Sequence, residues 1–156
     1  MRIHICAVGR LRAGPERVLV DDYLTRFDRT GRQLGLSFAD LHEVEDRKGG
    51  GKPAEAAVLE RAIPETAHVI ALDERGRHLT SPDFAALLAQ ERDGGCADLA
   101  FVIGGADGLD PALVARADMA LSLGVMVWPH MLVRVMLSEQ LYRAASILAG
   151  SPYHRS

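Results

Sequence analysis

The chain has few of the residues from which metal sites, disulfide frameworks and membrane spans are built. Two cysteines stand in 156 residues without a C-x-x-C pair, and the histidines follow no ligand spacing. We therefore expect neither a metal site nor a disulfide framework. The apolar runs are far too short to cross a bilayer. Arginines at positions 10 and 12 precede any signal-peptide core, which predicts a cytoplasmic protein without an export signal.

An excess of positive charge is also absent. The net charge of −3 excludes a protein that coats nucleic acid by bulk attraction. The charge is uneven, because residues 1–12 and 119–156 carry six arginines against Glu139 as their single acid. These arginines are Arg2, Arg10, Arg12, Arg134, Arg143 and Arg155. If the two ends of the chain meet in the fold, they form a local basic face.

Apolar segments alternate with amphipathic ones, as expected of one α/β domain over residues 1–156. The expected strands are residues 3–8, 36–44, 69–73 and 99–103, and the expected helices begin near Pro15, Pro53, Ser81, Pro111 and Met131. The strand at 69–73 is continuously apolar and is expected to be central. This order predicts a mainly parallel sheet with helices on both faces.

The starts of several helices carry sequence signals. Ser81 is predicted to be an N-cap with Pro82 at the first helical position, and Asp110 is expected to cap the next helix. His130 is expected to cap the last helix. Residues 46–52, which contain three consecutive glycines, are predicted to form a mobile loop.

Two glycine-containing segments are the most informative local feature. The strand at 99–103 ends in Gly104-Gly105-Ala106-Asp107-Gly108, and the apolar run 121–128 contains Gly124. Taken alone, they are typical of an ordinary turn and a core strand. The spacing of dinucleotide-binding glycines, a phosphate-loop lysine after residue 108 and a G-x-S-x-G elbow are all missing. Together with Leu72-Asp73, however, both segments fall where parallel sheets bind ligands, and their backbone groups favour a neutral heteroaromatic ring.

Residues 131–148 predict a helix that is apolar around most of its circumference. A helix of this kind is buried on all sides, and in so small a chain the sheet covers only one side of it. A symmetric homodimer that packs these helices together is the simplest arrangement. The charged residues on the helix, Arg134, Glu139 and Arg143, must then be paired or face a site.

A series of short motifs resembles one known family. They are Ile103-Gly104-Gly105, Gly108-Leu109, Ser122-Leu123, Pro129-His130, Leu132-Val133-Arg134, Glu139 to Ala144 and Pro152-Tyr153-His154-Arg155. In this order, over essentially the full chain, they are similar to the large-subunit ribosomal RNA pseudouridine N3-methyltransferases, the RlmH group of the SPOUT superfamily. The resemblance implies an α/β fold with a C-terminal trefoil knot.

The resemblance also implies that the protein transfers a methyl group from S-adenosyl-L-methionine to N3 of a pseudouridine in 23S rRNA. The positions implied to bind the cofactor are Leu72, Gly104, Leu123, Gly124, Val125, Met126, Val127 and Trp128. Gly124 stands where relatives commonly have serine, and Met131 stands where they have glutamine or proline. The change at Gly124 removes a hydroxyl but no backbone donor, so we expect cofactor binding to persist.

The C-terminal tail is implied to complete the site on the substrate side. Methyl transfer needs a nucleophile held in line, and a base or a cation helps because an imide nitrogen is only weakly acidic. His154 is the candidate titrating group. Arg155 suits a phosphate or the imidate oxygen, and Tyr153 can stack on a base.

Arg134 and Arg143 are predicted to contact RNA. Glu139 and Arg143 have two equally good interpretations, a pairing inside the dimer and a catalytic role. So short a chain has no separate RNA-binding domain, so substrate selection should depend on shape, through the dimer and the assembled ribosome. No membrane or metal partner is expected. A different class stays open, namely a knotted module that binds RNA without catalysis.

Overall fold

A computed structural model describes residues 1–155 of the chain. Within these residues, five parallel strands form one sheet in the order β2-β1-β4-β3-β5. The strands are β1 (Arg2–Val8), β2 (Ser37–Val44), β3 (His68–His78), β4 (Asp98–Ile103) and β5 (Met119–Ser122). The helices are α1 (Pro15–Gly31), the short 3-10 helix η1 (Arg32–Leu34), α2 (Gly51–Ala62), α3 (Ser81–Asp93), α4 (Pro111–Arg116) and α5 (His130–Leu148).

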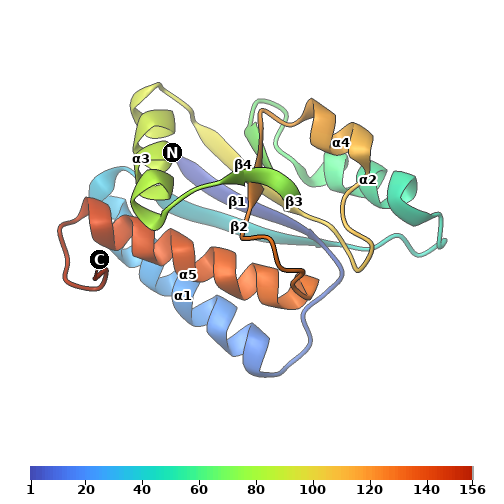
Figure 1. The fold of residues 1–156 in the computed structure, drawn as a ribbon, viewed down its shortest axis with the longest axis horizontal. Helices are drawn as coiled ribbons and strands as arrows, with labels where there is room; N and C mark the ends of the chain where they lie inside the picture. Colours follow the sequence, from blue (N-terminus) through green and yellow to red (C-terminus); the bar gives the residue numbers. More distant parts are fainter. Residues whose placement is uncertain (156) are drawn as a thin grey trace.

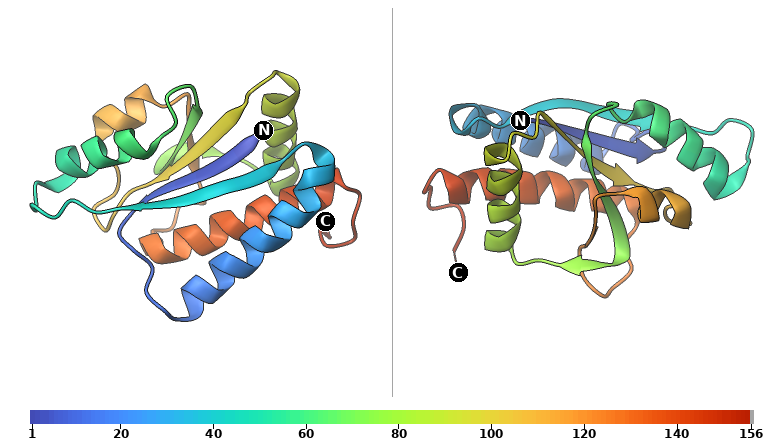
Figure 2. Two further views of the ribbon diagram at one scale, coloured as in Figure 1. Left: turned by 180° about the vertical axis from the view of Figure 1, so that it is seen from behind. Right: turned by 90° about the horizontal axis from the view of Figure 1, so that it is seen from above.

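The sheet is buried between two layers of helices (Figures 1 and 2). Side chains of β1 alternate between the two layers, as a strand requires. Ile3 and Ile5 pack into the core formed with α1, α3 and α5, whereas Cys6 and Val8 pack into the core formed with α2 and α4. The predicted α/β class, with a parallel sheet and helices on both faces, is confirmed.

β3 lies inside the sheet, between β4 and β5, while the middle position belongs to β4. Leu72 and Arg77 both lie opposite Leu121 of β5, so residues 73–76 bulge around that strand. The predicted strand covered only the part of β3 before this bulge. The trefoil knot stays a prediction.

A close backbone contact explains the glycine in this bulge. A Cβ atom on Gly76 would lie 2.6 Å from the carbonyl carbon of Ala120 and 2.7 Å from that of Leu121. Only a residue without a side chain lets β3 and β5 approach so closely.

Two predicted helix starts need correction. The N-cap of α3 is Thr80, whose hydroxyl accepts a hydrogen bond from the N–H of Asp83 at 3.2 Å. Ser81 is therefore the first helical residue and not the cap. At α5, His130 is itself the first helical residue. The N-cap is Pro129, which makes no side-chain capping hydrogen bond. Asp110, in contrast, caps α4 as predicted by accepting from the N–H of Ala112 at 2.8 Å.

The loop before α2 is shorter than the sequence predicts. The carboxylate of Asp46 accepts hydrogen bonds from the N–H groups of Lys48 and Gly50, at 3.2 and 2.6 Å. α2 then begins at Gly51, two residues before the expected start at Pro53.

The chain itself covers α5 on more than one side. This helix packs against α1 and α3 as well as β4, and Leu137 and Leu141 are fully buried. The expectation that the chain covers only the sheet-facing side of this helix is therefore wrong. The exposed apolar side chains are at its first turn, where Met131 and Leu132 are about 40% exposed. No helix within residues 1–155 has the length and apolar character needed to cross a membrane.

Candidate functional site

The two glycine-containing segments meet at the carboxyl ends of β4 and β5, beside the bulge in β3, where they line one cavity of about 690 Å³. This volume suits a small-molecule ligand. Most of the residues predicted to bind the cofactor line it, namely Leu72, Gly104, Leu123, Gly124, Met126, Val127 and Trp128. Val125 does not line the cavity, and its side chain is 85% exposed.

Within the run 121–128, Leu121 and Ser122 end β5, and residues 123–128 form a loop and not a core strand. β5 ends at Ser122, whose hydroxyl donates to the carbonyl of Gly124 at 2.8 Å and accepts from the N–H of Gly124 at 3.2 Å. Gly124 has a φ of +124°, a conformation that favours glycine. The following residues are exposed, and together they define an apolar patch of Val125, Met126, Val127, Trp128, Met131 and Leu132.

The opposite wall is a tight turn after β4. The N–H of Gly108 donates to the carbonyl of Gly105 at 3.0 Å, and Gly108 has a φ of +80°. A Cβ atom on Gly104 would collide with the backbone of Gly108 and Leu109. The glycines are therefore required by the turn itself, which fixes the shape of this wall.

Of the polar rim around the cavity, the sequence predicted only Asp73. The rim contains Lys52, Asp73 and Arg75. Burial raises the pKa of Asp73, but hydrogen bonds from Arg75 and the nearby charges of Arg75 and Lys52 outweigh it, so the net pKa lies below its ordinary value. The carboxylate is thus an ionised acceptor at the cavity edge. Its position directly after the apolar run 69–72 was the available signal.

His130 also lines the cavity, in addition to starting α5. Burial and the neighbouring charge of Arg134 lower the pKa of His130, and Glu55 opposes them. The ring is therefore neutral at neutral pH and offers one acceptor and one donor nitrogen.

Arg134, one turn after His130 on α5, is buried, with 1% of its surface exposed. Its Nη2 donates to the carbonyl of Val8 at 2.6 Å, and its Nη1 donates to Glu43 at 3.2 Å. These bonds join α5 to the ends of β1 and β2. A guanidinium held in this way is not placed to reach RNA, so the predicted RNA contact of Arg134 is corrected to a structural role.

The tail folds back on the end of α5 as a compact polar cluster. Glu139 accepts hydrogen bonds from the hydroxyl of Tyr153 at 2.9 Å and from Nη2 of Arg143 at 2.7 Å. Nη1 of Arg143 lies 3.3 Å from Nδ1 of His154, and its guanidinium lies over the Tyr153 ring at 4.8 Å. The Glu139–Arg143 pair therefore forms within one chain and does not need a dimer.

Tyr153 acts as a donor in this cluster. Burial raises the pKa of its hydroxyl, and the charge and hydrogen bond of Glu139 raise it further. The ring packs on Tyr142 with centroids 4.6 Å apart, so an aromatic surface is present at the tail.

One chain does not bring the tail and the cavity together. The cavity touches the first turn of α5 at His130 and Val133, whereas the tail follows its last turn, and none of the described residues 151–155 lines the cavity. α5 has 19 residues, so at about 1.5 Å per residue these ends are roughly 28 Å apart. Figure 1 shows the C-terminal tail at the opposite end of α5 from the loop that precedes this helix.

The basic face predicted from the two chain ends is largely neutralised. Arg2 pairs with Asp98 at 2.8 Å and Arg143 with Glu139 at 2.7 Å, while Arg134 is buried. The exposed members of the set are Arg2, Arg10, Arg12 and Arg155, of which Arg2 is paired with Asp98.

Comparison with known proteins identifies close relatives. The family described as predicted SPOUT methyltransferase matches residues 1–154. The ribosomal RNA large subunit methyltransferase H of Roseobacter denitrificans is 72% identical over 156 residues, with 100% of both chains covered. The protein of the same name from Dinoroseobacter shibae is 67% identical over 155 residues, with 99% of both chains covered.

A solved structure shares the fold. It is described as the structure of a probable methylase family protein from Haemophilus influenzae Rd KW20. The match covers 99% of this chain and 70% of that one, with a TM-score of 0.55 and 15% sequence identity.

Proposed function

Because this chain belongs to the SPOUT methyltransferase family, and within it to the RlmH group, we propose that it methylates N3 of a pseudouridine in 23S rRNA with S-adenosyl-L-methionine as the donor. The cavity supports this proposal most directly. It joins the two sequence segments that were predicted to hold the cofactor. The names of the relatives support a large-subunit rRNA substrate.

The residues around the cavity fit this cofactor. Leu72, Leu123 and Met126 supply apolar walls for the adenine ring, and the backbone of the two loops supplies polar groups for its edge. The ionised Asp73 on the rim offers oxygen acceptors to hydroxyl or ammonium groups. When bound, the cofactor supplies a methyl group on a positively charged sulfur.

The tail supplies the groups needed on the substrate side. The N3 nitrogen of the pseudouridine must lose a proton as it gains the methyl carbon, and His154 is proposed to accept that proton. Arg155 is proposed to hold a phosphate or the imidate oxygen. Tyr153 and the arginine stacked on it, Arg143, form a surface on which a base can stack.

A homodimer through α5 would unite the two parts. In a two-fold dimer with antiparallel α5 helices, the last turn of one helix lies beside the first turn of the other. The tail of one chain would then approach the cavity of its partner. The apolar patch beside that cavity supports such an interface, because exposed apolar residues of this density mark contact surfaces.

Substrate selection is proposed to depend on the assembled ribosome, which also places the protein in the cytoplasm. The test is the transfer of labelled methyl groups to whole ribosomes and to a short naked rRNA hairpin. We expect labelling of ribosomes and little labelling of the hairpin. Efficient labelling of the hairpin would contradict recognition by shape. Failure to bind S-adenosyl-L-methionine in calorimetry would instead favour a non-catalytic RNA-binding module.

A further inference from the structure

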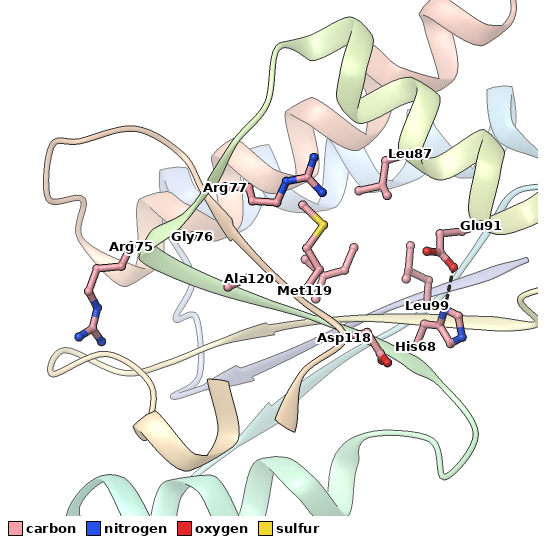
Figure 3. A pocket seen from close by; sticks show the side chains of 11 residues that line it. His68, Arg75, Gly76, Arg77, Leu87, Glu91, Leu99, Asp118, Met119 and Ala120 are labelled. Atoms are coloured by element: carbon pink, nitrogen blue, oxygen red, sulfur yellow. Dashed lines mark hydrogen bonds and ion pairs between the residues drawn. The ribbon is translucent and has the colours of Figure 1, made fainter. Parts of the chain in front are cut away.

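Three side chains with different metal-binding groups converge near the amino-terminal end of β3, away from the cofactor cavity. Nδ1 of His68, at the start of β3, lies 2.7 Å from Oε2 of Glu91 in the last turn of α3. Sγ of Cys96 joins them from the segment before β4, and the three ligand atoms all lie within 4.8 Å of one another. Figure 3 shows His68 and Glu91 facing each other at one end of a hollow of about 440 Å³.

The C-terminal cap of α3 holds two of these groups in place. The N–H of Cys96 donates to the carbonyl of Glu91 at 3.0 Å, and the N–H of Gly95 donates to that of Arg92 at 3.1 Å. With Gly95 at a φ of +88°, these two bonds form a Schellman motif. Backbone hydrogen bonds therefore bring Glu91 and Cys96 together, independently of any contact between their side chains.

The sheet register places the third group beside them. His68 lies opposite Leu99 in the pairing of β3 with β4, and Leu99 follows Cys96 by only three residues. Burial raises the pKa of the Cys96 thiol, and a hydrogen bond from the backbone of His68 opposes it. The Cys96 thiol donates to the carbonyl of Asp98 at 3.1 Å, and its sulfur lies within 4.8 Å of the ligand atom of His68.

We propose that His68, Glu91 and Cys96 form a zinc site. An imidazole nitrogen, a carboxylate oxygen and a thiolate are the three ligand types that Zn²⁺ takes in proteins. One carboxylate and one thiolate balance its two positive charges. Asp118, which also lines the hollow, already accepts the N–H of Val69 at 2.7 Å and is not counted as a ligand.

The observed separations need only small adjustments. Tetrahedral Zn²⁺ with bonds of about 2.0–2.3 Å places its ligand atoms roughly 3.3–3.8 Å apart. The side chain of His68 is 54% exposed, so its ring can move away from Glu91 to reach this spacing. The adjacent hollow leaves the fourth position to water.

The ligands come from three separate elements, which explains why their spacing in the sequence carried no signal. Bound zinc would tie the end of α3 to the starts of β3 and β4. Because the unfolded chain does not hold the three groups together, binding would stabilise the folded state. This inference does not depend on the proposed methyl transfer, since the site lies away from the cofactor cavity.

The test is titration of the purified full chain, free of metal, with zinc chloride in a calorimeter. We expect one Zn²⁺ per chain, release of protons and a higher Tm. His68→Gln, Glu91→Gln and Cys96→Ser should each weaken binding by about tenfold or more, since even the groups that support a ligand contribute this much. With Co²⁺ as the probe, a thiolate-to-metal absorption band should appear and should be lost in Cys96→Ser.

His78→Gln is a matched control, because His78 is exposed and lies at the other end of β3. It should leave zinc binding unchanged. Absence of zinc binding would overturn the proposal and leave a simple His68–Glu91 pair beside a helix cap. Binding that survives unchanged in Cys96→Ser would also overturn it.

Discussion

A Cβ atom on Gly104 would lie 2.5 Å from the carbonyl carbon of Gly108. The two backbones therefore touch directly, in a turn that forms one wall of the proposed cofactor cavity. The glycine is needed to close the turn. The shape of the cavity consequently depends on a contact within the chain, before any ligand is considered.

Gly104→Ala should therefore weaken the binding of S-adenosyl-L-methionine. The added methyl group forces the turn open, which should cost about 1–3 kcal/mol of folding stability and weaken binding at least tenfold. Calorimetry and urea unfolding measure both effects. Gly14→Ala is the control, because a Cβ there meets only Glu16 at 3.7 Å. Unchanged cofactor affinity in Gly104→Ala would contradict this role of the turn.

Arg134 and Arg155 should respond differently to the same substitution. Arg134→Ala removes the donor to the Val8 carbonyl and leaves Glu43 with Arg17 and the N–H of Leu11 as partners. It should lower the free energy of unfolding by about 1–3 kcal/mol. Arg155→Ala, at an exposed position, should change it by less than about 0.5 kcal/mol while reducing methyl transfer. Urea unfolding of both variants measures this difference in the free energy of unfolding. A stable Arg134→Ala protein that fails only in RNA binding would restore the original prediction for Arg134.

Mixed dimers test whether the tail acts across the interface. His154→Ala should reduce methyl transfer by about 10²–10⁴-fold, the usual contribution of a general base, and should leave cofactor affinity unchanged. A dimer of one His154→Ala chain and one Gly104→Ala chain has one intact site if the tail serves its partner. It should regain about half of the normal activity. If both homodimers and the mixed dimer are equally inactive, the tail serves its own chain.

Stability should depend on pH through Asp98. This carboxylate accepts hydrogen bonds from Arg2 at 2.8 Å and from His4 at 2.7 Å, which lower its pKa, the first more than the second. Because the pKa in the folded state lies below that of the unfolded chain, at about 3.9, the ionised group stabilises the fold above that value. The contribution is lost as the pH falls through the folded-state pKa.

The comparison with Asp98→Asn isolates this effect. The difference in urea midpoint between the two proteins should be largest above about pH 5 and should shrink toward pH 3. A difference that stays constant over this range would show that Asp98 acts through packing or neutral hydrogen bonds.

Local sequence signals predicted the elements well because each depends on neighbouring residues. The apolar run Ile3 to Val8 and the capping carboxylate of Asp110 are of this kind. The prediction was less accurate where a neighbour competes, since Thr80 takes the capping role that Ser81 also suits. The apolar run at 123–128 was read partly as strand because its composition does not reveal that Gly124 turns the chain outward.

Long-range relations could not be predicted in the same way. The double pairing of Leu121 with Leu72 and Arg77 depends on the path of β3 around β5. The burial of Arg134 depends on Val8 and Glu43, more than 90 residues away. The sequence did predict the length of α5. The distance between the tail and the cavity follows from that length, because the two lie at opposite ends of this helix within one chain.

Mass spectrometry of large-subunit rRNA tests directly whether this protein methylates a pseudouridine in that RNA. Ribosomal RNA from cells with the intact gene should contain one N3-methylated pseudouridine that is missing from cells without it. Purified protein and S-adenosyl-L-methionine should restore the methyl group on ribosomes from the deficient cells. Identical modification of the RNA with and without the gene would contradict the account.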